Sequence, residues 1–203
     1  MSNHKPLHNR IPVFIVGAIE GIIVILAIFC FMQAQGTHLQ HLYLYTTIAI
    51  VFIAALLYGG AYYTRKEELD ASDTESKTLK IYKALDIDDR LKDAMIADTI
   101  EEKKNWELSW QHEDNVTSSL TPQGYASSML LGFITGSLFI LLNNYFMQMP
   151  DYKALLLPLL VLGFLGYTKY KYSNKNPLTG MLLIALSGIA AAVGAYYAGG
   201  FFI

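Results

Sequence analysis

Long apolar runs alternate with polar connections along the chain, and this alternation is typical of a membrane protein. Five runs reach the roughly 20 residues that a helix needs to cross a bilayer core of roughly 30 Å. We expect these spans at residues 12–32, 42–63, 125–146, 154–172 and 178–202. The first run is too long for a cleaved signal peptide, and no small-residue cleavage site precedes Gln33, so we expect it to remain a span. The predicted fold is an all-α polytopic membrane protein with five transmembrane helices.

A charged segment at residues 65–118 interrupts this pattern between the second and third runs. It carries all of the chain's 17 carboxylates except Glu20 and Asp151. No turn signal precedes it, so we expect the second helix to continue out of the membrane. Inside the segment, apolar residues recur at spacings of three and four, which predicts two amphipathic helices with a break at residues 86–89. We therefore expect an acidic helical insert at residues 65–121, between residues 1–64 with the first two spans and residues 122–203 with the last three.

The lysine and arginine residues predict the orientation of the chain. All of them except Lys153 fall in the N-terminal tail, in the insert or at residues 169–175, between the fourth and fifth spans. Short positively charged segments are retained on the cytoplasmic side. We therefore expect a cytoplasmic N-terminus and insert and an external C-terminus. Short loops and the lack of an organelle signal favour a bacterial inner membrane.

The motif content argues against an enzyme. Cys30 is the single cysteine, so the chain forms no internal disulfide and no thiol cluster. The sequence has no phosphate-binding glycine loop, no H-E-x-x-H and no recognisable Ser, His and Asp signature. His38 and His41 share a loop, but two imidazoles without a third ligand are more often loop residues than a metal site. The acidic cytoplasmic face argues against nucleic acid as a partner, and we expect no cofactor.

Glu20 lies inside the first apolar run, flanked by Gly17 and Gly21. A carboxylate at the middle of a transmembrane helix costs about 2.5–3.5 kcal/mol, so such residues usually face the protein interior or an aqueous path. We interpret Glu20 as a candidate ligand in such a path. The alternatives are that it reaches water at the cytoplasmic boundary or is protonated against the backbone. The glycines on either side, like Gly132 and Gly136 in the third run, have the spacing that permits close helix approach.

Small and polar residues predict further contacts. The fifth run carries two rows of small residues, Gly188-Ala192-Tyr196 and Ala191-Ala195-Gly199. These rows predict a tight helix contact, either within the chain or with a second subunit. We expect Asn143 and Asn144 to bond across helices, and we expect Arg65 and Lys66 to lie at the lipid headgroups.

The insert offers carboxylates at helical spacing. Asp98, Glu101 and Glu102 stand at i, i+3 and i+4, close enough for two of them to share a cation. Lysines interspersed along the insert offer ordinary ion pairs instead. A solvated acidic face is therefore the alternative to metal binding.

The order of the segments resembles the vacuolar iron transporter family along nearly the whole chain. Both have two spans, an acidic helical insert continuous with the second span, and then three spans. The local similarities are residues 17–21, Gly-Ala-Ile-Glu-Gly against the family's G-A-N-D-G, residues 63–69, Ile81-Tyr82, residues 106–114, Pro122 and residues 180–199.

This resemblance implies a homodimer, embedded in membrane lipid, that exchanges Fe²⁺ or Mn²⁺ for protons. The metal is then a transported ion and not a cofactor. Glu20 matches the family's first-span aspartate, which is a pathway ligand. The carboxylates that fall where the insert's metal ligands would lie are Glu67, Glu68, Glu101, Glu102, Glu113 and Asp114. Carboxylate oxygens suit both metals, and reversible replacement of the metal by protons gives coupling.

Two departures from the family pattern leave an alternative open. Where the family has G-E-Y at the end of the second span, this chain has Gly59-Gly60-Ala61-Tyr62, so the second membrane carboxylate is missing. Glu20 then acts alone or with its counterpart in a second subunit. In the second insert helix, Trp110 and Gln111 stand in place of paired methionines. The alternative is a non-transporting interaction or scaffold protein that dimerises through the insert.

Overall fold

The computed structural model describes residues 10–84, 120–147 and 153–201. These residues form five helices and no strand. The helices are α1 (Arg10–Ala34), α2 (Leu39–Ala84), α4 (Pro122–Met147), α5 (Lys153–Tyr172) and α6 (Pro177–Gly200). The all-α prediction is confirmed for the described part of the chain.

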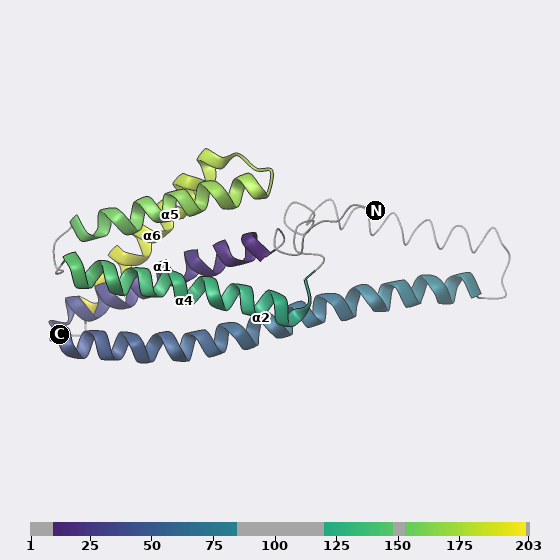
Figure 1. Cartoon of the computed structure of the whole chain (residues 1–203), viewed down its shortest axis with the longest axis horizontal. Coiled ribbons are helices and arrows are strands. Elements are labelled where there is room, and N and C mark those ends of the chain that lie inside the picture. The colour runs from purple at the N-terminus through teal and green to yellow at the C-terminus, as the bar shows by residue number, and fades with distance from the viewer. Residues whose placement is uncertain (1–9, 85–119, 148–152, 202–203) are drawn as a thin grey trace.

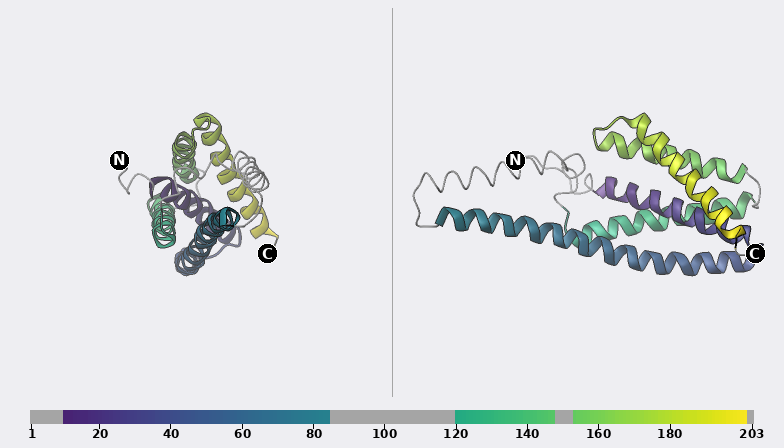
Figure 2. Two further views of the ribbon diagram at one scale, coloured as in Figure 1. Left: turned by 90° about the vertical axis from the view of Figure 1, so that its right-hand side faces the viewer. Right: turned by 180° about the vertical axis from the view of Figure 1, so that it is seen from behind.

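Helix α1 is the central element of the bundle. It contacts each of the other four helices, and it lies among them in Figures 1 and 2. Ile22, Ile25, Leu26 and Phe29 of α1 are almost completely buried, because neighbours cover this helix on several sides. A helix that is apolar around its whole circumference is expected at such a position.

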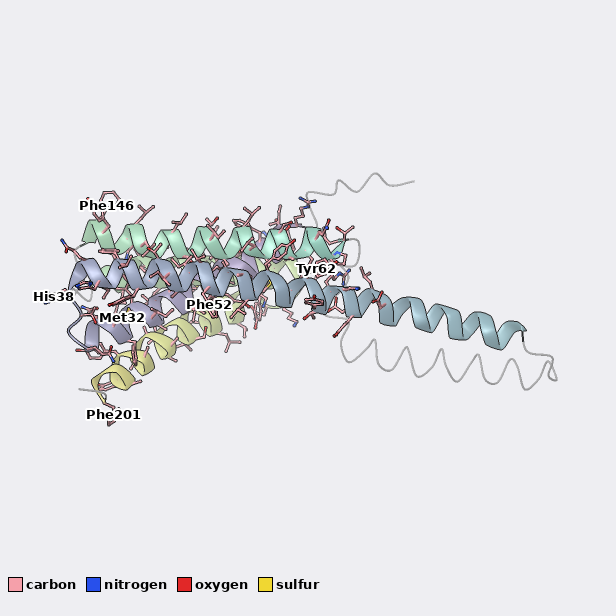
Figure 3. All side chains as sticks on the ribbon, turned by 90° about the horizontal axis from the view of Figure 1, so that it is seen from below. Met32, His38, Phe52, Tyr62, Phe146 and Phe201 are labelled. Carbon is pink, nitrogen blue, oxygen red and sulfur yellow. The ribbon has the colours of Figure 1, made fainter. Side chains whose placement is uncertain are left out.

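The helices alternate in direction, so the bundle has two ends. Helices α1, α4 and α6 begin at one end, and α2 and α5 run towards it (Figure 1). We call this the charged end, because Arg65 of α2 and the lysines at the end of α5 lie there. We call the opposite end the far end, where His38, Met32, Phe146 and Phe201 lie (Figure 3).

Helix α2 extends well beyond the bundle. Its 46 residues correspond to a length of roughly 70 Å at a rise of 1.5 Å per residue, about twice the thickness of a bilayer core. The C-terminal half projects past the charged end (Figures 1 and 3). The prediction that the second helix continues without a break into the insert is therefore confirmed as far as Ala84. The predicted break at residues 86–89 and the second insert helix lie outside the described residues.

Four helices of the described part are long and apolar enough to cross a membrane: Arg10–Ala34, Gln40–Asp70, Pro122–Phe146 and Pro177–Gly200. Helix α5 forms where the fourth span was expected, but its role as a span stays a prediction. Large apolar side chains cover the outer faces of the bundle, for example Leu44, Val51 and Phe52 on α2 and Leu182 on α6. Such continuous exposed apolar faces suit contact with lipid.

Helices α1 and α4 approach each other closely enough for their backbones to meet. A Cβ atom on Gly17 or Gly21 would overlap the carbonyl oxygen of Met129 or Phe133, respectively. A Cβ atom on Gly132 or Gly136 would overlap the carbonyl oxygen of Phe14 or Ala18 in the same way. The two glycine pairs singled out in the sequence therefore pack against each other. Because neither helix carries side chains there, their backbones come into direct contact.

The small residues of α6 also pack within the chain. Gly188 lies against the side chain of Leu162 on α5, and Gly199 lies against the backbone of Phe31 on α1. One member of each predicted row thus packs against another helix of the same chain, Gly188 against α5 and Gly199 against α1. Tyr196, at the end of the first row, remains exposed.

Candidate functional site

Glu20 is the carboxylate that the bundle holds among its helices. It lies midway along α1, and its side chain is half-buried. It makes no hydrogen bond or ion pair with any other described residue. Lys169, near the end of α5, is the charged side chain whose field acts on it. A central, partly accessible carboxylate without a fixed partner is able to take up a cation or a proton.

The depth of Glu20 in the bundle follows from its neighbour Gly21. A Cβ on Gly21 would lie 3.0 Å from the backbone nitrogen of Ser137 on α4. Glu20 therefore lies at about the level of Ser137, roughly midway between the two ends of α4. This position is within the membrane-spanning part and not at its charged boundary, which argues against the alternative that Glu20 simply reaches water there.

Ser137 and Asn144 of α4 are the most deeply buried of the polar side chains on this helix, which also buries Ser128 and Asn143. Ser137 is 0% exposed and Asn144 is 1% exposed. Among the residues that the structure describes, the Ser137 hydroxyl and both polar atoms of the Asn144 side chain have no hydrogen-bond partner. The expectation that Asn144 bonds across helices is therefore not met by any residue that the structure describes.

Arg65 joins the projecting part of α2 to the start of α4. Its side chain is buried, with 6% exposure. Its Nε donates a hydrogen bond to the carbonyl oxygen of Leu120 at 3.3 Å, and its Nη1 contacts Oε2 of Glu68 at 2.7 Å. Arg65 is thus an internal link and not the headgroup anchor that the sequence suggested, whereas Lys66 is exposed as expected.

The predicted insert ligands are only partly within the described residues. Glu67 is exposed, and Glu68 is half-exposed and already paired with Arg65. Glu101, Glu102, Glu113 and Asp114 lie outside the described residues. Over residues 10–84, 120–147 and 153–201, no group of three His, Cys, Asp or Glu side chains could hold a metal ion. The metal site of the insert stays a prediction.

Apart from Lys153, which begins α5 at the far end, the basic residues of the described part lie at the charged end or beyond it on α2. The Arg10 guanidinium lies beside Gly124, in the first turn of α4, and Arg65 reaches Leu120 just before that helix. Lys169 and Lys171 lie in the last turn of α5, and this helix ends at the same end of the bundle (Figure 1). The side of the membrane that the charged end faces stays a prediction from the positive-inside rule.

Comparison with known families identifies the chain. A model of the VIT family, the vacuolar iron transporters, matches residues 61–200, which is more than half of the chain. The chain belongs to the VIT family. A search of curated proteins gave no match. The VIT family consists of membrane metal transporters and not of enzymes, in agreement with the motif content of this VIT protein.

The matched residues have a consequence for Glu20. They begin at Ala61, so they include the projecting half of α2, the insert and the helices α4 to α6. Helix α1 lies before them. The correspondence of Glu20 with the family's first-span aspartate therefore depends on the local Gly-Ala-Ile-Glu-Gly similarity and on the position of Glu20 in this VIT bundle.

Sequence reasoning missed two features of the site. Ser137 has no sequence signal that separates it from other serines in membrane helices. Arg65 directly follows an apolar run, and a basic side chain at such a position usually lies at the lipid headgroups. Its spacing of three residues from Glu68 was the available signal for an internal ion pair.

Proposed function

We propose that this VIT protein exchanges a divalent metal, Fe²⁺ or Mn²⁺, for protons across the membrane, with Glu20 as the ligand in the middle of the path. The family supports membrane metal transport. The observation that carries the specific role is the position of Glu20, half-buried in the central helix and unpaired among the described residues. A carboxylate kept without a structural partner at this depth fits reversible ligand exchange.

The proposed cycle has three steps. Carboxylates of the insert, among them Glu67, Glu101, Glu102, Glu113 and Asp114, raise the local concentration of the cation at the charged end. Ionised Glu20 then binds the cation, because carboxylate oxygens suit Mn²⁺ and Fe²⁺. A proton arriving from the far end neutralises Glu20 and releases the metal. Glu68 joins the first step only when the cation displaces Arg65, which already occupies its Oε2 atom.

We further propose that the protein acts as a homodimer in the cytoplasmic membrane of a bacterium, with the insert inside. Glu20 keeps partial exposure in the single chain, and α2 presents an apolar face to its surroundings. A second chain against these surfaces would complete the enclosure of the carboxylate. Cross-linking in membranes, followed by sizing of the purified protein in detergent, tests this assembly.

Uptake of Mn²⁺ into proteoliposomes, followed together with a pH-sensitive dye trapped inside, tests the function. The wild-type chain should take up Mn²⁺ and move protons in the opposite direction. Glu20→Gln should abolish both signals, because an amide neither ionises nor exchanges a proton. Glu20→Asp, which keeps the carboxylate, is the matched control and should retain measurable uptake.

Undiminished uptake by Glu20→Gln would refute the role of Glu20. If the wild-type chain moves no metal although it is folded and reconstituted, the transport proposal fails. The alternative, an interaction or scaffold protein that dimerises through the insert, would then be preferred. Deletion of the insert that leaves the dimer intact would in turn exclude that alternative.

A further inference from the structure

One face of α4 is buried along its whole length. Its members are Ala126, Phe133, Ser137, Ile140 and Asn144, each with 0% or 1% exposure. Their spacings of seven, four, three and four residues place them in a single row along the helix. The half of this row near the charged end is apolar, and the half towards the far end carries the two polar side chains.

The polar half of the row begins at the depth of Glu20. Gly21, the neighbour of Glu20, packs against the backbone of Phe133 and Ser137. Asn144 lies seven residues further along α4, roughly 10 Å closer to the far end. It lies in the last turn of the helix, which ends at Met147. Glu20, Ser137 and Asn144 thus lie at successive depths between the middle of the bundle and its far end.

The unpaired atoms indicate what these side chains bind. Polar groups buried in a membrane protein are satisfied by protein, by water or by a ligand, because leaving them unpaired in an apolar medium is costly. Within residues 10–84, 120–147 and 153–201, Asn144 lacks both a donor for its Oδ1 atom and an acceptor for its Nδ2 group, and the Ser137 hydroxyl lacks any partner. A bare cation would satisfy the oxygens alone. A cation that keeps its water satisfies both kinds of atom, because the water molecules bound to it donate to the oxygens and the water beyond them accepts from the Nδ2 group.

We propose that Ser137 and Asn144 form a hydrated station for a divalent cation, which connects Glu20 with the far end of the bundle. This inference rests on the proposed transport function and adds residues of the exit half of the path. Neutral oxygen ligands such as a hydroxyl and an amide carbonyl hold a hard divalent cation more weakly than a carboxylate does. The cation therefore leaves this station more readily than it leaves Glu20.

Thiol labelling of the full-length chain in sealed membrane vesicles tests the station. The parent is Cys30→Ala, which removes the single natural cysteine, and Ser137→Cys and Asn144→Cys are made in it. The reaction of a thiol with a small cationic methanethiosulfonate reagent needs a water-accessible thiolate. If water reaches the proposed station, the reagent should therefore modify both thiols. Leu162→Cys, in the apolar core, and Leu138→Cys, on the outer face of α4, are the controls and should react at least roughly tenfold more slowly.

Protection by metal separates a cation station from structural water. Millimolar Mn²⁺ should slow the modification of Ser137→Cys and Asn144→Cys by roughly tenfold while leaving the controls unchanged. Thiols that react no faster than Leu162→Cys would overturn the hydrated path. Thiols that react equally fast with and without Mn²⁺ would overturn the cation station and leave bound water only.

A second variant keeps the test decisive if a cysteine at either position prevents folding. Asn144→Asp replaces the amide with a carboxylate of nearly the same shape, so the full-length chain should bind Mn²⁺ roughly tenfold more tightly. The loss of the free Mn²⁺ signal in electron paramagnetic resonance measures this binding, and unchanged affinity counts against the station. Uptake that depends on Glu20 together with unreactive thiols would refute this inference alone. Reactive, Mn²⁺-protected thiols in a chain that transports nothing would refute only the proposed function.

Discussion

The Nε of Arg65 donates a hydrogen bond to the carbonyl oxygen of Leu120, 55 residues away in the sequence. Leu120 is followed by Thr121 and by Pro122, the first residue of α4. The bond therefore joins α2, where it leaves the bundle, to the start of the next membrane helix. The same guanidinium also holds Glu68, one turn further along α2. Arg65 thus links the projecting part of α2 to the start of α4, in addition to the packing of the two helices against each other.

Removal of this link should destabilise the bundle. In Arg65→Ala, the carbonyl oxygen of Leu120 loses the hydrogen bond donated by Nε and Glu68 loses its ion pair. Loss of a buried hydrogen-bond partner costs about 1–3 kcal/mol, so the thermal unfolding midpoint of the protein in detergent should fall. Lys66→Ala, at the exposed neighbouring position, is the control and should change the stability by less than about 0.5 kcal/mol. Equal midpoints for the two variants would show that Arg65 is not a structural link.

The backbone contact between α1 and α4 should not tolerate a methyl group. In Gly21→Ala, the new Cβ overlaps the carbonyl oxygen of Phe133, and two helix backbones cannot move aside as a flexible side chain would. Overpacking of this kind costs about 1–3 kcal/mol or more. Gly194→Ala is the matched control, because no atom lies within 4 Å of a Cβ built there. It should leave the unfolding midpoint unchanged or raise it, since alanine favours the helix by about 1 kcal/mol.

The two carboxylates at the exit of α2 should differ in metal binding. Glu68 is held by Arg65 at 2.7 Å, so a cation must displace the guanidinium. Glu67 is exposed and has no ion pair with another described residue. Calorimetric titration of the full-length chain with Mn²⁺ should therefore show a larger loss of affinity for Glu67→Gln than for Glu68→Gln. The opposite order would mean that Arg65 releases Glu68 easily.

The pair Glu101 and Glu102 should contribute to the metal affinity of the insert. We expect the full-length chain to bind Mn²⁺ and expect this binding to weaken strongly in the double variant Glu101→Ala and Glu102→Ala. Lys103→Ala with Lys104→Ala, which alters the adjacent positions without removing a carboxylate, serves as the control and should not weaken binding. No heat of binding for the wild-type chain at millimolar Mn²⁺ would contradict a metal-gathering insert.

Labelling of cysteines at two exposed positions would show the orientation of the chain in the membrane. His38 lies at the far end of the bundle (Figure 3), and Lys171 lies near the end of α5 at the charged end. In the Cys30→Ala background, a membrane-impermeant maleimide added to intact cells should label His38→Cys and spare Lys171→Cys. After the cells are opened, both should be labelled. Labelling in the reverse order would place the insert outside and overturn the positive-inside assignment.

The sequence alone was enough to predict the helices and their order along the chain. Uninterrupted apolar runs can form only helices in a bilayer, because every backbone polar group must be paired within the segment. The long α2, the start of α4 at Pro122 and the family were therefore accessible from patterns of residues. The sequence also showed the two glycine pairs, but only as glycines four residues apart. It did not show that the two pairs contact each other.

Only the tertiary structure decided which residues meet. It brought Gly17 and Gly21 against Gly132 and Gly136, although more than 100 residues separate the two pairs in the chain. It buried Arg65, whose position in the sequence is indistinguishable from that of a headgroup anchor. It also placed Ser137 and Asn144 on the inner face of α4, whereas Leu138, next to Ser137, faces outwards. A periodic apolar pattern is weak when lipid and core are equally apolar, so apart from the small residues the sequence has little signal for which face of a membrane helix points inwards.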